Sequence, residues 1–157
     1  MKACDVMRRA VVSLPQNAAL KEVIRTFVKN QIDSLPVVDA AERVVGFIVL
    51  DRLADLFLPR YAEILRDYAA LEDKGQLAPL FENAFSGLDR AQENLIVAAD
   101  LMNSRLDWVT TEDSLIQAAS RLRSQRLERL PVVDRDRKLV GLISECAVIL
   151  ALLYGTR

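Results

Sequence analysis

The side chains that enzymes use most often for chemistry are sparse in this chain. It contains no histidine, which removes Ser-His-Asp and Cys-His catalytic groups, histidine-bound zinc and the usual general base near neutral pH. Its carboxylates are scattered, with no pair at a spacing that indicates acid-base work. The two cysteines, Cys4 and Cys146, form no metal motif, and small buried thiols in a reducing compartment are a better interpretation than a disulfide. We therefore expect a protein that is not an enzyme and holds no metal.

Arginine is the remaining residue type that could bind a ligand through its chemistry. Four arginines recur at near-helical spacing: Arg121, Arg123, Arg126 and Arg129. Such a run is usually the solvated face of an amphipathic helix. Alternatively, Arg129, which directly precedes Leu130 and Pro131, pairs with a phosphate through its planar guanidinium fork. The net charge of -1 and the lack of a groove-reading motif argue against nucleic acid as a partner.

An internal repeat fixes where these side chains must lie. The segment Leu-Pro-Val-Val-Asp at 35–39 recurs at 130–134, an offset of 95 residues. The same offset aligns further residues without a gap, among them Asp5, Met7, Leu20, Gly46 and Ile48 with Asp100, Met102, Leu115, Gly141 and Ile143. Two copies of one supersecondary unit are therefore present, at 3–57 and 98–152. With 157 residues, 52% of them hydrophobic, the chain predicts one globular module made of two halves.

Each copy predicts the order strand, helix, strand, strand, helix. Apolar residues at helical spacing predict amphipathic helices near 20–28 and 115–122, the second introduced by the helix-start signal at 110–113. Leu-Pro-Val-Val-Asp is typical of a short buried strand, with Pro36 or Pro131 at its start, where no ladder donor is needed.

The second strand of each copy, at 44–50 and 139–144, contains one glycine, Gly46 or Gly141. A glycine inside a strand often marks a place where another group approaches the backbone closely. A helix follows each second strand, and Asp51 and Ser144 are the expected N-cap residues.

The segment 59–97 has no counterpart in either copy. Its apolar residues at helical spacing, and the lack of a Gly/Ser/Pro-rich linker composition, predict two or three helices. We thus divide the chain into repeat one (1–58), a helical insert (59–97) and repeat two (98–157). Neither a signal peptide nor a membrane-spanning apolar run is evident, so we expect a cytoplasmic protein without membrane insertion.

Both copies resemble the cystathionine-β-synthase (CBS) domain, and together they resemble a CBS pair. The resemblance rests on Asp-Val-Met or Asp-Leu-Met, an amphipathic helix, Leu-Pro-Val-Val-Asp, and Val-Gly-hydrophobic-Ile. The insert is similar to that of stand-alone bacterial CBS-pair proteins. The resemblance implies an α/β (α+β) fold with two β-α-β-β-α repeats related by a pseudo-two-fold axis and two clefts between them. It also implies that two pairs associate into a flat disc.

The resemblance further implies an adenosyl ligand in the clefts: AMP, ADP, ATP or S-adenosylmethionine. The family pattern runs from the strand glycine through two hydrophobic residues to Thr or Ser, then two residues and Asp. In it the hydroxyl meets the phosphate, and the carboxylate accepts hydrogen bonds from the ribose. Both copies depart from the pattern. Val49 and Arg52 stand at the hydroxyl and aspartate positions of repeat one, whereas repeat two keeps Ser144 but has Ala147 in place of Asp.

Two positions each allow two interpretations. Asp51 is either a helix N-cap or a ribose contact. Trp108 stands at a position where the family often has threonine and where repeat one has Ser13. Its ring either stacks on a base or packs in a core or interface. With the strand residues that border the clefts, the candidate ligand-binding residues are Ser13, Ser34, Pro36, Asp51, Trp108, Arg129, Pro131 and Ser144.

Two functions compete on these grounds. The first is a regulatory sensor that binds an adenosyl compound, in the repeat-two cleft, and modulates an unidentified protein partner; it requires no cofactor. The second is a scaffold whose degenerate clefts are plugged by its own side chains, with Phe47, Arg52 or Trp108 as candidates. In either case we expect a homodimer, because the final helix, 147–153, has little polar face to show water.

Overall fold

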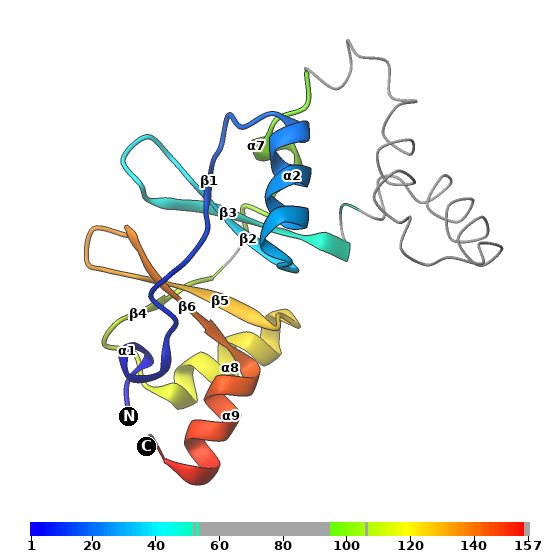
Figure 1. Ribbon diagram of the computed structural model, residues 1–157. Coiled ribbons are helices and arrows are strands. Elements are labelled where there is room, and N and C mark those ends of the chain that lie inside the picture. Colours follow the sequence, from blue (N-terminus) through cyan, green and yellow to red (C-terminus); the bar gives the residue numbers. More distant parts are fainter. Residues whose placement is uncertain (52, 54–94, 106, 156–157) are drawn as a thin grey trace, which may run out of the picture.

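Two three-stranded sheets, each with its own helices, lie side by side in the computed structural model (Figure 1). The structure describes residues 1–51, 53, 95–105 and 107–155. The strands, in sheet order, are β1 (Leu14–Pro15), β2 (Ser34–Val38) and β3 (Val44–Val49), then β4 (Val109–Thr110), β5 (Arg129–Val133) and β6 (Leu139–Ser144). The helices are α1 (Ala3–Val6), α2 (Leu20–Asn30), α7 (Ala98–Leu101), α8 (Leu115–Gln125) and α9 (Glu145–Tyr154). The predicted mixed α and β fold with two repeats is confirmed, whereas the helices predicted for the insert fall almost wholly outside the described residues.

The two sheets share one register, which shows that the sequence repeat is a structural repeat. In each sheet the first strand is parallel to the second and the second is antiparallel to the third. Val37 lies opposite Gly46, and Val132 lies opposite Gly141. Both antiparallel pairs have an irregularity one step further on, between Val37 and Val38 and between Val132 and Val133.

The two strand prolines lie inside their strands rather than at the start, which corrects the sequence-based expectation. Pro36 is the third residue of β2 and pairs with Phe47, whose own N–H bonds to Asn103 on the far side of β3. The ring nitrogen of Pro36 therefore faces the other edge of β2, where β1 pairs only with Val37 and Val38. No donor is needed at that point, so the proline costs the ladder nothing. Pro131 and Leu142 repeat the arrangement in β5 and β6.

Each repeat has a separate apolar core under its amphipathic helix. Helix α2 buries Leu20, Val23 and Phe27, and helix α8 buries Leu115, Ala118 and Leu122. Full burial of each large apolar side chain contributes about 1.5–3 kcal/mol, so these stripes hold the helices on their sheets. Helix α8 begins after Ser114, one residue beyond the predicted start signal, and Ser114 Oγ accepts the Gln117 N–H at 3.3 Å.

The helices that follow the second strands differ at their starts. Ser144 is the N-cap of α9, as predicted, and its Oγ accepts the Ala147 N–H at 3.2 Å. In repeat one, helical conformation begins at Leu50, one residue before the predicted cap Asp51. Among the described residues, no helix is long and apolar enough to cross a bilayer.

The short N-terminal helices are exchanged between the repeats. Helix α1, at the start of repeat one, packs in the core of repeat two, where the Ala3 N–H donates to the Asp113 carbonyl at 2.8 Å. Helix α7, at the start of repeat two, packs in the core of repeat one, where the Ala98 N–H donates to the Ala18 carbonyl at 2.8 Å. Each repeat therefore completes the core of the other, and Figure 1 shows α1 beside the second sheet and α7 beside α2.

The two strand glycines make this exchange possible. A Cβ atom at Gly46 would lie 2.4 Å from Met102 Sδ, and one at Gly141 would lie 2.5 Å from Met7 Sδ. These methionines directly follow α7 and α1. The interpretation of the glycines as points of close approach is thus confirmed, and the approaching group is a methionine of the other repeat.

Hydrogen bonds between the two β-hairpins join the sheets at one end. Arg43 and Lys138 form an antiparallel bridge, flanked by hydrogen bonds from Val44 N–H to the Arg137 carbonyl (3.1 Å) and from Leu139 N–H to the Glu42 carbonyl (3.2 Å). Glu42 and Arg137, at matched positions, have φ values of 62° and 64°. The hairpins hold this end together, and the larger described cleft lies at the other end of β3, beside Val49.

Candidate ligand-binding cleft

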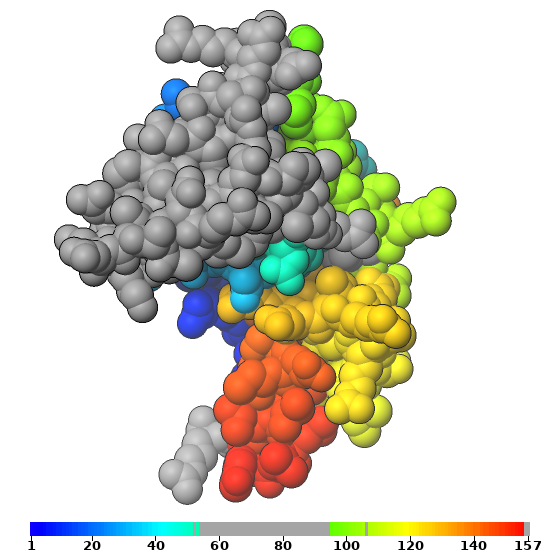
Figure 2. Space-filling view, turned by 90° about the vertical axis from the view of Figure 1, so that its right-hand side faces the viewer, coloured from blue at the N-terminus to red at the C-terminus, as the bar shows by residue number. Residues whose placement is uncertain are grey.

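A cleft of about 700 Å³ lies between the repeats at the C-terminal end of β3. Four described parts of the chain line it: the start of β2, the end of β3, the segment from α7 toward β4, and the segment from the end of α8 into β5. In Figure 2 a cyan patch at the end of β3 meets the yellow surface of α8 and β5, and the green 95–105 segment lies to the right, above the yellow. The described lining residues are Asp33, Ser34, Phe47, Val49, Asp51, Leu101, Met102, Asn103, Ser104, Arg105, Gln125, Arg126, Leu127, Glu128 and Arg129.

One wall of the cleft is apolar and is held rigidly by the strands. Phe47 is buried in the middle of β3, and its backbone exchanges two hydrogen bonds with Asn103, at 3.2 and 2.9 Å. Val49 ends the strand, and Met102 reaches the cleft from the exchanged segment after α7. Apolar walls of this kind with a few polar groups are typical of small-molecule sites, which commonly have volumes of roughly 300–1,000 Å³.

An ion pair between the two repeats also lines the cleft. Arg129, the first residue of β5, places its Nε 3.2 Å from Asp33 Oδ1 and its Nη2 3.4 Å from Asp33 Oδ2. Ser34, which is buried, donates its hydroxyl to Asp33 Oδ1 at 2.9 Å. The predicted phosphate-binding arginine is therefore present at the cleft, but a carboxylate of the same chain already occupies part of its guanidinium fork.

Of the eight residues predicted from the sequence, the structure brings three together in this cleft: Ser34, Asp51 and Arg129. Asp51 is exposed in the helical turn that follows β3. It stands one residue before the family aspartate position, which falls on Arg52, outside the described residues. Pro36 and Pro131 lie buried within their strands and do not line the cleft.

The three other predicted residues lie elsewhere. Ser13 borders a shallower hollow along α2, of about 490 Å³. The ring of Trp108 has the guanidinium of Arg137 over it, 4.3 Å from the ring centre, and the Trp108 carbonyl accepts a hydrogen bond from Arg121. Ser144 is engaged as the cap of α9.

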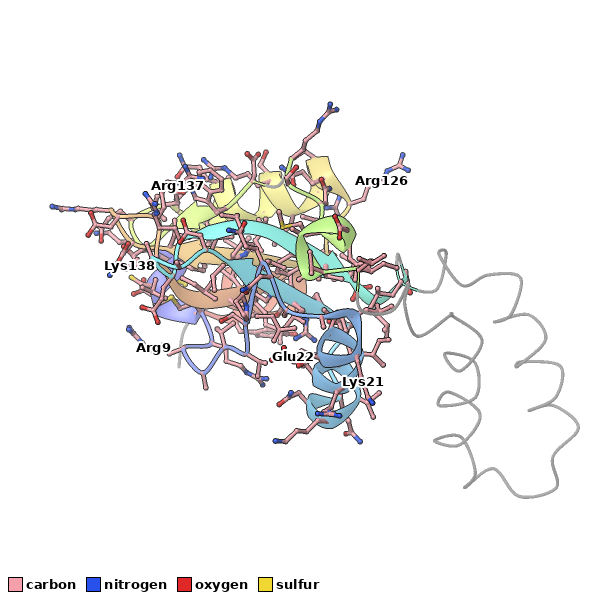
Figure 3. All side chains as sticks on the ribbon, turned by 90° about the horizontal axis from the view of Figure 1, so that it is seen from above. Arg9, Lys21, Glu22, Arg126, Arg137 and Lys138 are labelled. Carbon is pink, nitrogen blue, oxygen red and sulfur yellow. The ribbon has the colours of Figure 1, made fainter. Side chains whose placement is uncertain are left out.

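The arginines of repeat two do not act as a single patch. Arg121 pairs with Asp113 at 3.5 Å, and Arg123 lies 3.8 Å from Glu145. Arg126 ends α8 in the left-handed region (φ 53°) and lines the cleft. Figure 3 shows Arg126 at one end of the molecule and Arg137 and Lys138 at the other. The solvated-face interpretation thus describes part of the run, and of its four arginines Arg126 and Arg129 line the cleft.

Sequence reasoning missed several polar residues of the cleft, among them Asp33, Asn103 and Arg105. Asn103 directly follows the repeated Asp-Leu-Met motif, and Asp33 immediately precedes Ser34. Both positions adjoin matched motifs, which is the signal that could have found them. Which of these neighbours faces the other repeat depends on the exchange of α7, and no periodicity reports it.

The sequences of the two repeats identify the family. The CBS domain model matches residues 3–58 and 97–154, the two copies that the structure shows as separate sheets. The chain belongs to the CBS domain family. A curated relative, an uncharacterized protein of Methanocaldococcus jannaschii, is 24% identical over 153 residues, covering 95% of this chain and 89% of that one.

Solved CBS structures share the fold over nearly the whole chain. The CBS-pair protein CBSX2 of Arabidopsis thaliana is 23% identical with a TM-score of 0.68, covering 97% of this chain and 94% of that one. A crystal structure of CBSX2 in complex with AMP is 22% identical with a TM-score of 0.69, covering 99% of this chain and 98% of that one. A CBS domain pair in complex with 5′-methylthioadenosine and S-adenosyl-L-methionine is 16% identical with a TM-score of 0.62, covering 100% of this chain and 98% of that one. At these identities the match establishes the shared fold.

Proposed function

We propose that this CBS pair is a regulatory ligand-sensing module that binds an adenosyl compound in the described cleft. The observation that carries the proposal is the meeting of an apolar wall (Phe47, Val49, Met102) with Asp51 and Arg129 in one cleft of about 700 Å³. The structures of CBS pairs with AMP and with S-adenosyl-L-methionine support the ligand class. The sequence-based hypothesis put the ligand in the repeat-two cleft, whereas this proposal puts it at the end of β3.

The residues divide the binding work by their chemistry. The base lies against Val49 and Met102, which are partly exposed in the cleft, because apolar contact favours a flat ring there. Asp51 accepts hydrogen bonds from the ribose hydroxyls. Arg129, with Arg126 at the rim, supplies planar donors for a phosphate or carboxylate.

Regulation requires that the ligand prefer one arrangement of the repeats over another. A ligand can shift an equilibrium only by its difference in affinity for the two states. The cleft contains groups from both repeats, so a ligand that contacts Asp51 and Arg129 together favours the arrangement that holds them close. We propose that an unidentified protein partner in the cytoplasm responds to this change.

Thermal shift and calorimetry with AMP, ADP, ATP and S-adenosylmethionine test the binding. A ligand at 100 times its Kd stabilises the native protein by about 2.7 kcal/mol, which gives a clear rise in Tm. Asp51→Ala is expected to weaken binding about tenfold through the loss of a charge-assisted hydrogen bond. Cys146→Ala, at the matched position of repeat two, is the control and should leave affinity unchanged. An unchanged Tm at saturating concentrations of all four compounds would overturn the proposal.

A second function, self-association, is favoured by the exposed face of α9. After Glu145 this helix has only apolar residues, and the exposed ones include Ile149, Leu150, Leu152, Leu153 and Tyr154. Ile116, on the neighbouring helix α8, is 71% exposed. Figure 2 shows α9, in red, on the surface of the molecule. Because a contiguous apolar surface of this kind is typical of an interface, we propose that a second copy of the chain covers it.

Light scattering after size exclusion tests this association. The wild type should elute with about twice the chain mass of 17.6 kDa. Leu153→Glu places a charge in the proposed interface and should yield a monomer. Val28→Glu changes an equally exposed apolar residue on α2, in the other repeat, and should remain a dimer. A wild type that is monomeric at micromolar concentration contradicts the proposal.

A further inference from the structure

The ion pair between Asp33 and Arg129 has a definite geometry inside the cleft. Two separate nitrogen–oxygen contacts, at 3.2 and 3.4 Å, align the carboxylate with one edge of the guanidinium. The Ser34 hydroxyl donates to the same carboxylate at 2.9 Å and so orients it. All three side chains line the cleft. The two charges come from different repeats, and the side chains are 47% and 31% exposed, so solvent and ligands can reach them.

The two copies of the repeat do not contribute equivalent residues to this ion pair. At the offset of 95 residues, Asp33 corresponds to Glu128, and Ser34 corresponds to Arg129. Glu128 lines the same cleft as Asp33, but the structure shows it in no ion pair with any described residue. The cleft therefore contains two matched carboxylates, of which one is held against the guanidinium.

We propose that Asp33 sets the charge selectivity of the cleft by competing with the anionic group of the ligand for Arg129. An incoming phosphate must either displace the Asp33 carboxylate or lie beside a like charge only a few ångströms away. Two unit charges about 4 Å apart repel by about 1 kcal/mol in water and more near a protein surface, which corresponds to at least a fivefold loss of affinity. An uncharged adenosyl compound does not pay this penalty. The proposal rests on the proposed adenosyl-binding function.

The test compares AMP with adenosine, its uncharged counterpart, by calorimetry at fixed ionic strength. Asp33→Asn keeps the shape and the hydrogen bond from Ser34 but removes the charge. We expect this variant to bind AMP about tenfold more tightly than wild type and to bind adenosine with unchanged affinity. Arg129→Gln in the same background should abolish the gain, because the freed guanidinium is its source.

Glu128→Gln is the matched control, because it removes the same charge from the same cleft without touching the pair. Its gain in AMP affinity should be clearly smaller than that of Asp33→Asn, because the Glu128 carboxylate is not paired with Arg129. An equal gain in Glu128→Gln, or an equal gain for adenosine in Asp33→Asn, would overturn the proposal, since either result indicates general electrostatics or a changed cleft shape.

Pyrophosphate separates this proposal from the proposed function. If no adenosyl compound binds any variant, but pyrophosphate raises the Tm of Asp33→Asn more than that of wild type and Glu128→Gln, the adenosyl function fails and the role of Asp33 stands. If no adenosyl compound binds any variant and pyrophosphate changes the Tm of all three proteins equally, both proposals are wrong.

Discussion

The two repeats bring the same backbone to the boundary between them but present different side chains there. Opposite each other in register are Ser34 and Val49 in repeat one, and Arg129 and Ser144 in repeat two. Repeat one thus has a hydroxyl on its second strand and an apolar residue at the end of its third, whereas repeat two has a guanidinium and a hydroxyl. The Ser144 hydroxyl caps α9, so the group that the family pattern offers to a phosphate is used for folding in repeat two.

This difference shows which parts of a duplicated unit are free to diverge. Gly46 and Gly141 and the strand prolines remain matched, and most buried positions are apolar in both copies, because the exchange of α1 and α7 and the two cores depend on them. The polar residues at the cleft contribute little to either core. They therefore differ between the copies without changing the fold: in repeat two Arg129 pairs with Asp33, and Ser144 caps α9.

The strand glycines provide the largest expected effect and test whether the two backbones are equivalent. Gly46→Ala forces its Cβ against Met102, and Gly141→Ala does the same against Met7. Each should lower the free energy of unfolding by about 1–3 kcal/mol, the usual cost of overpacking a filled site. Urea unfolding measures the loss.

The methionines supply the control for this prediction. In a Met102→Ala background, Gly46→Ala should cost clearly less than in wild type, because the obstructing side chain has been removed. Unequal costs at Gly46 and Gly141 would show that one exchanged segment yields more easily than the other and would break the equivalence of the repeats.

The capping serine tests the divergence at the ends of the third strands. Ser144→Ala leaves the Ala147 N–H without its partner and should cost about 1 kcal/mol, the typical value of an N-cap. Ser120→Ala, at an exposed position within α8, should change stability by less than about 0.5 kcal/mol. Thermal unfolding of both variants checks the contrast. Equal, small effects would indicate that Ser144 is free to serve a ligand.

A double-mutant cycle on Asp33 and Arg129 measures the coupling energy of the ion pair between the repeats. Both side chains are partly exposed, so solvent screening limits their coupling to about 0.5 kcal/mol. Urea unfolding of Asp33→Asn, Arg129→Gln and the double variant gives this number. A coupling indistinguishable from zero would contradict the competition that we propose, because a carboxylate that does not interact with Arg129 cannot compete with a ligand for it.

The smallest effect concerns the hairpin turn of repeat one. Backbone N–H donation from Arg43 and Ala41 to the Asp39 carboxylate lowers the pKa of Asp39 below 3.8. A lowered folded-state pKa means that this stabilisation is present above about pH 4 and is lost as the pH falls through the folded-state value. The stability difference between wild type and Asp39→Asn should therefore shrink on acidification, as unfolding at pH 6 and pH 3 can show. A difference that grows at low pH would contradict this assignment.

Much of the fold was predictable because its signals are local and occur twice. The Leu-Pro-Val-Val-Asp strands, the amphipathic stripes of α2 and α8 and the cap at Ser144 follow from side-chain patterns within about ten residues. Where the sequence-based expectations were wrong, the reason was tertiary. Pro36 is tolerated inside β2 because the pairing with β1 starts only at Val37, the next residue. Nothing in the sequence of β2 shows where that pairing starts.

The sequence by itself determined the repeat, the order of elements and the family resemblance, since these depend on composition and spacing. It also supplied three residues of the cleft, Ser34, Asp51 and Arg129. Only the tertiary structure decided that α1 and α7 exchange places and that Asp33 meets Arg129 across 96 residues of chain. Such contacts are selected by the packing of two complete repeats against each other, and hydrophobic periodicity within one repeat contains no record of which edge faces the other.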